Sequence, residues 1–399
     1  MKKGYISQIF TVAAFVISLA VFMVLTFIVP RDDKSAELEQ RELATLPELT
    51  LSSAFSGDFE RDFETYLTDN VGFRSTLMVL SSRLESLKGI KPEGGKLVTA
   101  SKDLGTGADG TKNLLILKDR VMEVFHKNDS ARESYIEMLN GYADLFGDNV
   151  QLYSMIVPTQ IEFNPAGEGL SDSELDTIDY IYNNIDKRIN AVNVYDTLKA
   201  HSDDYIYFRT DHHWTGLGAL YAYEKFTELK DGDPSDISGL HKYSRDGFLG
   251  YLYNQANDRS LAEYADTIEW FDYGKNYDVN ARAASADGFT EYKTKIYSIP
   301  PTSEAPKYSI FMGGDHQFAR IETDLENGKT LLVIKDSYAN ALIPLLCRDY
   351  SEILVIDPRN FYSTVSELIK EYEIDDCLII NYVFTTTFPD FIAKLNEVR

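Results

Sequence analysis

Strand-like and helix-like segments alternate from about residue 113 to the C-terminus, and this alternation constrains the fold more than any other feature. Apolar runs of strand length occur at 150–157, 331–334, 353–356 and 378–383. The runs Leu331–Ile334 and Ile353–Ile356 contain only apolar residues, as expected of strands buried on both faces. The pattern therefore predicts an α/β protein with a largely parallel sheet covered by helices on both sides.

The segments between these runs have helical periodicity, and one long region breaks the rhythm. Helices are predicted at 129–146, 173–189, 216–229 and 363–372, with another ending near Arg348; shorter strands are predicted at 191–195 and 205–208. Residues 232–305 are rich in Tyr, Gly and Asp and are interpreted as an insertion of loops and short strands. The α/β domain is thus predicted to span 113–399, with an insertion at about 232–305.

The N-terminal segment is predicted to be a membrane anchor. Ile6–Val29 is a run of 24 uncharged residues, and about 20 apolar residues span a bilayer. Lys2 and Lys3 precede the run, which places the N-terminus in the cytoplasm and everything after residue 31 outside. The alternative is a cleaved signal peptide, but no A-x-A-like site follows. The sequence therefore predicts a single-pass cell-membrane protein with a cytoplasmic tip and signal anchor over 1–30.

Residues 31–112 are predicted to hold a stalk, amphipathic helices and a loop. Phe55, Phe59, Phe63 and Leu67 recur every fourth residue, as on one face of a helix, and a second helix is expected from Arg74 to Leu87.

The charge excludes one class of partner. The chain has 39 Lys and Arg against 63 Asp and Glu, a formal charge of −24, so nucleic acid is not expected to bind. The two cysteines, Cys347 and Cys377, lie in apolar surroundings and are predicted to be buried; whether they pair is left open.

Polar residues follow the predicted strands where each strand ends. Ligands of open parallel sheets bind outside the carboxyl ends of the strands, so these residues are expected to meet at one edge. They are Thr159, Gln160, Asp211, His213, Asp336, Ser337, Asp357, Arg359 and Asn381. A serine, a histidine and an aspartate are therefore predicted to converge.

Ser337 is the candidate nucleophile. It ends a buried strand and precedes a helical pattern, where its own N–H could stabilise an oxyanion. The alternative is a plain N-cap serine. Pro344 removes a donor inside the proposed helix, so the helix either breaks there or begins near Pro344 with Asn340 as its cap.

Asp211-x-His213 is the candidate base and its orienting carboxylate. An imidazole can take the serine proton while a carboxylate holds its other nitrogen. His212 is expected to point to the opposite side from His213 and to be structural. Trp214 is interpreted as core or pocket wall. A D-x-H triplet also occurs in metal sites.

Further candidates surround these three residues. Adjacent glycines at 313 and 314 could bring a second oxyanion donor, with Gly314 as the candidate, or simply form a turn. Arg359 could clamp an anionic or sugar substrate, or pair with a carboxylate. Asp336, Tyr338 and Trp214 complete the predicted substrate-binding set. No metal ion and no cofactor are expected.

Several motifs carry a resemblance to a known family. QRELATLP, the F-x-x-x-F-E-x-Y-x-x-D segment from Phe59, TDHHWT, VIKDSYAN and VIDPRNF resemble the DHHW protein family, which is similar to the SGNH hydrolase-like proteins of alginate and related polysaccharide O-acetylation. The resemblance implies an SGNH-like three-layer sandwich and a triad of Asp211, His213 and Ser337. Lys335 stands where a G-D-S motif has glycine.

Three functions are compared. The leading hypothesis is a cell-surface O-acetyltransferase or acetylesterase acting on an extracellular polysaccharide, and the resemblance implies a membrane-bound O-acyltransferase as acyl donor. The second is a metallo-phosphoesterase, which would need more histidine ligands than the chain offers. The third is a non-catalytic glycan-binding or scaffold protein whose 26 tyrosines suit sugar stacking.

Overall fold

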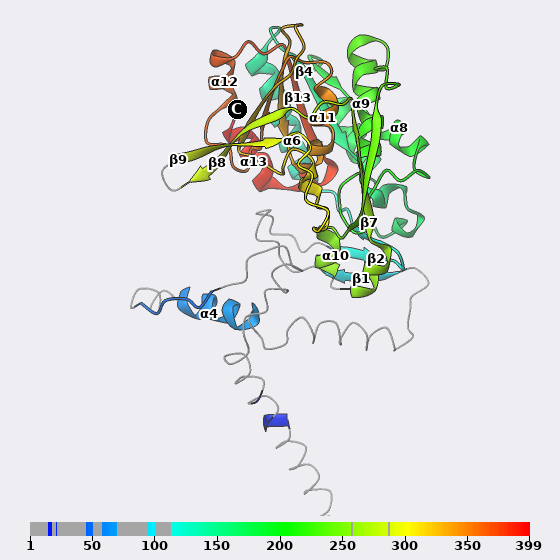
Figure 1. Ribbon diagram of the computed structural model, residues 1–399, viewed down its shortest axis with the longest axis vertical. Coiled ribbons are helices and arrows are strands. Elements are labelled where there is room, and N and C mark those ends of the chain that lie inside the picture. Colours follow the sequence, from blue (N-terminus) through cyan, green and yellow to red (C-terminus); the bar gives the residue numbers. More distant parts are fainter. Residues whose placement is uncertain are drawn as a thin grey trace, which may run out of the picture. The chain divides into compact units, whose positions relative to one another are not determined.

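The computed structural model describes residues 15–17, 21, 45–50, 58–69, 95–99, 113–256, 258–285 and 288–399. The chain divides into two compact units: one holds residues 1–91 and 257–260, the other 92–256 and 261–399 (Figure 1). The second unit contains the strands and the candidate site.

In the first unit, helix α4 spans Asp58–Asp69, where an amphipathic helix was predicted. The rings of Phe59 and Phe63 stack with centroids 5.6 Å apart, which puts them on one face of the helix. The second predicted helix and nearly all of the predicted anchor, Ile6–Val29, lie outside the described residues. In the part that is described, no helix is both long and apolar enough to cross a membrane.

The second unit is built on an eight-stranded sheet. In spatial order its strands are β5 (Ile189–Ala191), β4 (Gln151–Val157), β13 (Asp376–Tyr382), β11 (Thr330–Lys335), β12 (Glu352–Ile356), β10 (Phe318–Glu322), β8 (Asp278–Ser285) and β9 (Gly288–Lys295). The first five strands run parallel to one another. Strand β10 pairs antiparallel with β12, β8 pairs antiparallel with β10, and β9 pairs antiparallel with β8. The predicted mixed α/β fold with a largely parallel sheet is confirmed.

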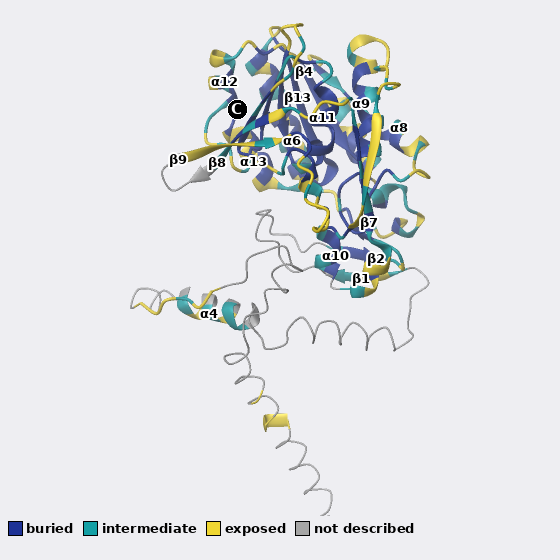
Figure 2. Cartoon of the chain, viewed as in Figure 1, coloured by how far each residue is buried: buried dark blue, intermediate teal, exposed yellow. Residues whose placement is uncertain are grey.

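The register brings the carboxyl ends of the parallel strands to one edge. Ile334 of β11 pairs with Ile356 of β12 and with Ile379 of β13, and Tyr382 of β13 pairs with Val157 of β4. Every residue of β11 and β13 is buried, so both faces of the central strands are covered (Figure 2). The residues that follow these strands are therefore neighbours in space.

Helices pack around this sheet and connect its strands. They are α6 (Asp129–Phe146), α7 (Glu174–Asn184), α8 (Tyr195–Ala200), α9 (Gly216–Asp231), α11 (Ile343–Leu346), α12 (Val365–Glu371) and α13 (Pro389–Glu397). Helix α10 (Tyr251–Ala256) packs instead against strand β3 (Val121–Glu123). The long α6 is capped at its N-terminus by Asn128, whose side chain accepts a hydrogen bond from Ala131 N at 3.1 Å. Its buried face packs on β4 and β5 and on α13.

The region 232–305 is more closely built into the fold than an appended insertion would be. Strands β6 (His241–Phe248) and β7 (Asp266–Asp272) form a separate ribbon, but β8 and β9 extend the main sheet through β10. A small antiparallel sheet of β1 (Lys96–Thr99), β2 (Asn113–Ile116) and β3 (Val121–Glu123) precedes the main sheet in sequence.

The structure tests two further predictions, on the segment 205–208 and on the two cysteines. The strand predicted at 205–208 is wrong: only an isolated bridge joins Tyr207 to Trp214, because this segment is a tight loop. Cys347 and Cys377 are both buried and both free.

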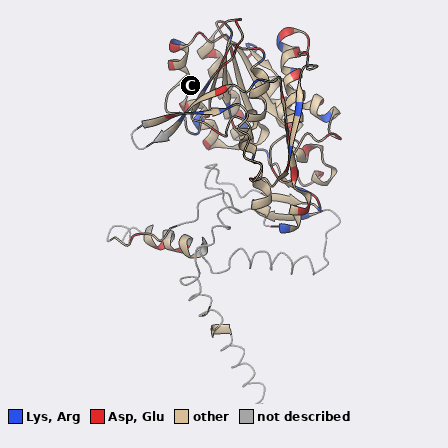
Figure 3. Ribbon diagram, viewed as in Figure 1, with Lys and Arg blue, Asp and Glu red and all other residues tan. Residues whose placement is uncertain are grey.

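Acidic and basic residues are interspersed along the second unit (Figure 3).

Candidate active site

Ser337 stands directly after β11, at the start of a short 3₁₀ helix, η5 (Ser337–Ala341). The carboxylate of Asp336 caps this helix by accepting a hydrogen bond from Tyr338 N at 3.0 Å. Its other oxygen accepts bonds from Tyr382 N and Thr385 Oγ1, both at 2.9 Å. Asp336 therefore ties the serine turn to the end of the neighbouring strand β13.

The helix that follows is short, and its cap differs from the predicted one. The regular helix α11 begins at Ile343, which places Pro344 in the first turn, where a missing N–H breaks no helical bond. Asn340 does not cap it; its Nδ2 donates to Asp315 Oδ1 at 2.9 Å.

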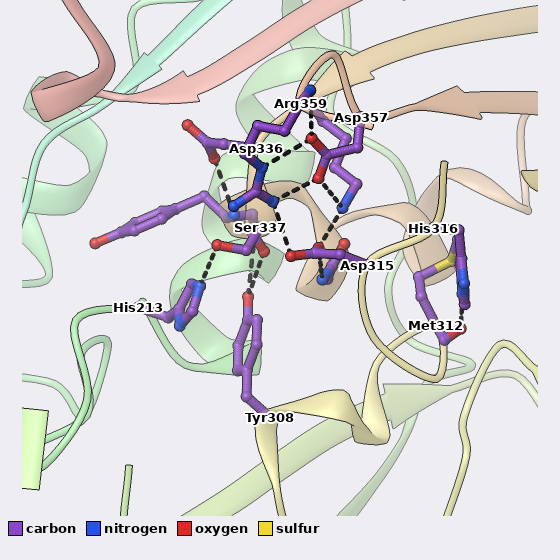
Figure 4. A network of polar contacts seen from close by, with 12 residues as sticks. His213, Tyr308, Met312, Asp315, His316, Asp336, Ser337, Asp357 and Arg359 are labelled. Atoms are coloured by element: carbon purple, nitrogen blue, oxygen red, sulfur yellow. Dashed lines mark hydrogen bonds and ion pairs between the residues drawn. The ribbon is translucent and has the colours of Figure 1, made fainter. Parts of the chain in front are cut away.

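His213, Asp211 and Ser337 form one hydrogen-bonded chain; Figure 4 shows its contact between His213 and Ser337. His213 Nε2 lies 2.8 Å from Ser337 Oγ, and His213 Nδ1 lies 2.6 Å from Asp211 Oδ1. A carboxylate only accepts, so the proton of the neutral ring sits on Nδ1 and Nε2 accepts from the serine hydroxyl. The three side chains are therefore aligned for proton transfer from serine to histidine.

Asp211 is buried, yet it is held as a carboxylate. Burial would raise its pKa, but the two neighbouring imidazoles, His213 above all and then His212, together with the hydrogen bonds it accepts, keep the pKa of Asp211 well below its usual value. Its Oδ1 accepts from His213 N at 3.0 Å and its Oδ2 from Tyr251 N at 2.8 Å. It is thus charged over the whole physiological range.

A second buried carboxylate shapes the loop that carries Asp211. Asp266, on β7, accepts hydrogen bonds from Arg209 N and Thr210 N, each at 2.8 Å, and from the hydroxyls of Thr210 and Tyr205. Thr210 Oγ1 in turn accepts from Gly250 N at 3.0 Å. The region 232–305 therefore supports the D-x-H loop directly.

The histidine loop and the serine turn are clamped to each other. Trp214 Nε1 donates to Tyr338 O at 2.8 Å, and Tyr338 Oη donates to His212 O. Trp214 and Tyr338 are fully buried, so these bonds are shielded from water. Both side chains hold backbone in place and, like Asp336, are committed to internal contacts.

Tyr308 is an additional site residue. Its ring stacks on the His213 ring at a centroid distance of 3.8 Å and an angle of 10°, and its hydroxyl donates to Ser337 O at 3.2 Å (Figure 4). It fixes the imidazole plane and the serine backbone at once. The sequence does not single it out, because a tyrosine among 26 carries no pattern that distinguishes it.

His212 departs from its expected position. Its ring lies 3.9 Å from that of His213, so the two rings are neighbours and the prediction of opposite sides is wrong. The physical reason is that Thr210–Trp214 is a tight loop, in which side chains do not alternate as they do in a strand.

Ligand atoms of Asp211, His212 and His213 lie within 4.8 Å of one another, a set that could in principle hold a metal ion. Both ring nitrogens of His213, however, already face Asp211 and Ser337. A metal ion could use that ring only by breaking one of these contacts.

Arg359 lies in an ionic network around the serine turn. Its guanidinium donates to Asp315 Oδ2 at 2.8 Å and, through Nε, to Asp357 Oδ1 at 2.9 Å. Lys335 Nζ lies 2.5 Å from Asp315 Oδ1, so the lysine that replaces the expected glycine neutralises this carboxylate. Burial lowers the pKa of Arg359, whereas the carboxylates of Asp357 and Asp315 raise it, and the net effect is a rise. Arg359 is thus held beside the segment that carries Ser337.

The glycine pair lies in an unusual turn. Met312, Gly313 and Gly314 all have positive φ, at 64°, 78° and 111°. Gly314 N donates to Phe311 O at 3.1 Å, so this candidate oxyanion donor is engaged within its own turn. His316 has both ring nitrogens bonded, to Met312 O and to the Tyr292 hydroxyl, each at 2.6 Å.

The remaining strand-end residues support the structure. Asn381 Nδ2 donates to Asp336 Oδ2 at 3.2 Å, and its Oδ1 accepts from Tyr135 Oη at 2.9 Å. Thr159 donates twice to the buried Glu174, both at 2.6 Å. Gln160 lies at the end of β4 and lines a surface pocket.

Fold and site together define a mixed α/β protein with an aspartate, a histidine and a serine in hydrogen-bonded series at the carboxyl edge of its sheet. The DHHW protein family model matches residues 93–356, and the chain belongs to this family. No match was found among curated proteins.

The chain is similar to several solved structures. A DHHW family protein from Eubacterium siraeum is 28% identical, with a TM-score of 0.63, covering 75% of this chain and 98% of the other. Bacillus cereus PatB1 is 17% identical, with a TM-score of 0.61 and coverage of 70% and 99%. The O-acetyltransferase domain of Pseudomonas putida AlgJ is 13% identical, with a TM-score of 0.43 and coverage of 72% and 100%.

Proposed function

We propose that the chain is a serine acyl-transfer enzyme in which Ser337 is the nucleophile, His213 the general base and acid, and Asp211 the group that orients His213. The observation that carries the proposal is the unbroken chain of contacts from Asp211 Oδ1 through both nitrogens of His213 to Ser337 Oγ, at 2.6 and 2.8 Å. Nucleophile, base and orienting group within hydrogen-bond reach are the features that this chemistry requires.

The reaction has two balanced half-steps. Ser337 Oγ attacks the carbonyl carbon of an acyl ester while His213 Nε2 takes the serine proton, and that proton then passes to the departing alcohol. In the second half-step an acceptor hydroxyl attacks the acyl-serine, His213 takes its proton, and the proton returns to Ser337 Oγ as the new ester leaves. A sugar hydroxyl as acceptor gives a transferase, and water gives an esterase.

The backbone N–H of Ser337 is the proposed oxyanion donor, because it lies at the start of η5 beside the nucleophile. Gly314 could act as a second donor only after its bond to Phe311 O opens. Arg359 is the proposed substrate contact of the predicted set, since Trp214, Asp336 and Tyr338 are buried.

The motif resemblance directs the choice of substrate. It suggests acetyl as the acyl group, an extracellular polysaccharide as acceptor and a membrane-bound O-acyltransferase as donor. The SGNH hydrolase-like class of the fold and the cellular location belong to the same proposal: a cell-surface domain held by one N-terminal membrane helix.

Replacement of the nucleophile tests the proposal. Ser337→Ala is expected to abolish hydrolysis of 4-nitrophenyl acetate while leaving the thermal unfolding curve unchanged, because only a half-buried hydroxyl is lost. Ser134→Ala removes an exposed hydroxyl from α6 and serves as the matched control. Turnover retained in Ser337→Ala would contradict the assignment.

Two further measurements separate the alternatives. A serine-reactive phosphonate should label the wild-type chain at Ser337; a protein that binds glycans through the same fold without chemistry would stay unlabelled. Metal analysis of the purified chain tests the Asp211–His213 cluster, where stoichiometric zinc, manganese or iron would favour the metallo-phosphoesterase.

A further inference from the structure

A polar pocket outside the triad opens at the same edge of the sheet. It has a volume of about 280 Å³, close to the lower end of small-molecule sites, roughly 300 Å³. Its walls combine aromatic rings with hydrogen-bonding side chains, among them Arg120, Gln160, Phe163, Asn164, Tyr205 and Arg209. We name it the β4 pocket, because Gln160 follows the carboxyl end of β4.

The β4 pocket lies along the edge from Ser337. In the sheet, only β13 separates β4 from β11, and the residues after all three strands share one edge. A small cavity of about 10 Å³ also contains Gln160 in its wall, together with Asp211 and His212. Gln160 is therefore a wall shared by the pocket and the surroundings of the triad.

The polar groups of the pocket are fixed in place. Gln160 accepts a hydrogen bond from Arg120 Nη1 at 3.2 Å and donates to Phe208 O. Arg120 and Arg209 are brought together by the backbone, because Val121 N donates to Arg209 O at 2.9 Å. The guanidinium of Arg209 lies over the Tyr205 ring, 5.2 Å from its centroid. A ligand would meet preorganised groups, which lowers the entropic cost of binding.

The lining fits a sugar with no net charge. Aromatic rings offer an apolar face to a pyranose ring, while arginine and amide groups offer hydrogen bonds to its hydroxyls. The two arginines are offset by Asp119, which pairs with Arg120 at 2.9 Å, and by Asp203 and Asp204 in the wall. With a chain charge of −24, a polyanion would be repelled.

We propose that the β4 pocket is an acceptor subsite that binds a neutral sugar residue of a glycan chain whose reacting hydroxyl reaches Ser337. This inference rests on the proposed acyl transfer. It assigns to the acceptor one direction along the carboxyl edge, from β11 across β13 to β4.

A second pocket supplies the matched control. It has a volume of about 370 Å³ and lies at the antiparallel side of the sheet, where its walls include Arg282, Phe318, Arg320 and Tyr372. In Figure 1, α8, which precedes the Ser202–Arg209 wall of the β4 pocket, and the β8–β9 hairpin lie on opposite sides of the sheet. Arg120→Ala and Arg320→Ala therefore remove the same side chain from the two flanks of the site.

The kinetic test compares a small ester with a long acceptor. With 4-nitrophenyl acetate as the donor, Arg120→Ala is expected to raise the KM for acetyl transfer to cellohexaose or hexa-N-acetylchitohexaose by about tenfold more than it alters hydrolysis of 4-nitrophenyl acetate, since a charged hydrogen-bond donor is lost. Arg209→Ala is the second variant, in case the first perturbs folding. A larger rise in Arg320→Ala, or equal losses on both substrates, would overturn the proposal.

Direct binding separates this inference from the proposed chemistry. In full-length Ser337→Ala, calorimetry is expected to show that one of the two neutral hexamers binds more tightly than hexagalacturonate, and that adding Arg120→Ala weakens it about tenfold. Binding with this dependence but no ester turnover in the wild type would defeat the acyl-transfer mechanism and leave the subsite. Turnover without neutral-hexamer binding, or tighter hexagalacturonate binding, would defeat the subsite.

Discussion

At the residue scale, the site depends on how few degrees of freedom His213 retains. Its two nitrogens are bonded to Asp211 and Ser337, and Tyr308 covers one face of its ring. A ring held in this way needs little reorganisation when it takes a proton, and the buried charge of Asp211 stabilises the imidazolium that forms.

Removing the charge of Asp211 tests this account. Asp211→Asn is expected to lower kcat on 4-nitrophenyl acetate by about 10³–10⁴-fold, because an amide holds the wrong tautomer and cannot stabilise the imidazolium. The control is Asp278→Asn, at a surface ion pair with Lys295. A fall of less than tenfold, measured with the folded fraction checked by circular dichroism, would show that Asp211 does not orient His213.

The buried carboxyl group of Glu174 makes the stability of the chain depend on pH. Burial raises the pKa of this carboxyl from 4.5 to about 8, against the opposing hydrogen bonds from Thr159. The folded chain thus keeps a proton that the unfolded chain releases above pH 4.5. The stabilising contribution is complete below that pH and is lost as the pH rises toward 8.

Glu174→Gln should therefore flatten the pH dependence of the free energy of unfolding between pH 5 and 8. Its amide still accepts from Thr159 N and can donate to Thr159 Oγ1. We expect the difference in free energy of unfolding, variant minus wild type, to be larger at pH 8 than at pH 5 by about 2 kcal/mol or more, as measured by urea denaturation. The exposed Glu168→Gln is the control, and parallel curves for wild type and Glu174→Gln would refute the role of this carboxyl.

At the element scale, the segment from β6 to β7 supports the catalytic loop. Gly250, in the turn between β6 and α10, donates to Thr210, and the next residue, Tyr251, donates to Asp211. The backbone approaches so closely that a Cβ on Gly250 would lie 2.3 Å from Asp211 Cβ. Only glycine fits at this contact without moving the aspartate.

Gly250→Ala is consequently expected to displace Asp211 and to lower turnover of 4-nitrophenyl acetate by about 10²-fold, since small misplacements in a reacting constellation are costly. Gly239→Ala, whose added Cβ would meet no atom closer than 3.7 Å, should keep wild-type turnover. If the two variants have equal turnover, the close contact does not position Asp211.

Elements with strong periodicity could be predicted from the sequence, and those defined by distant contacts could not. The buried runs of β11, β12 and β13 and the helix α6 were found because burial on both faces, or on one helical face, leaves a pattern of its own. Strand β10 follows a glycine turn and was missed. Strand β8 alternates polar and apolar residues, but its buried positions include the small Ala281, and β9 consists mostly of exposed polar residues, so neither was singled out within 232–305.

The same distinction holds for the site. Asp211, His213 and Ser337 could be named because each follows or lies next to a predicted strand end. The residues that support the triad could not be named: Tyr308 and Asp266 reach the triad loops only through contacts formed in the folded chain, 95 and 56 residues of sequence away from His213 and Thr210. The predicted position of His212 was wrong because neighbouring side chains do not alternate in the Thr210–Trp214 loop as they would in a strand.

At the scale of the whole molecule, the sheet edge organises the proposed chemistry. The ionic network of Arg359 lies on the β12 side of Ser337, and the β4 pocket lies on the other side, beyond β13. An acceptor chain following this edge would pass the nucleophile between two fixed polar surfaces. The net charge of −24 would in addition repel acidic polymers.

The predicted N-terminal anchor decides where this chemistry takes place. Because Ile6–Val29 is long enough to span a bilayer and Lys2 and Lys3 precede it, the full chain is expected to stay in the membrane fraction after alkaline carbonate extraction. Protease added to protoplasts or spheroplasts, whose cytoplasmic membrane is intact, should then digest the α/β unit. A matched variant with Val12→Lys, Val16→Lys and Leu19→Lys should leave the membrane fraction, since each central charge costs about 2.5–3.5 kcal/mol. Wild-type chain released by carbonate, or protected from external protease, would place the domain elsewhere and remove the extracellular acceptor from the proposal.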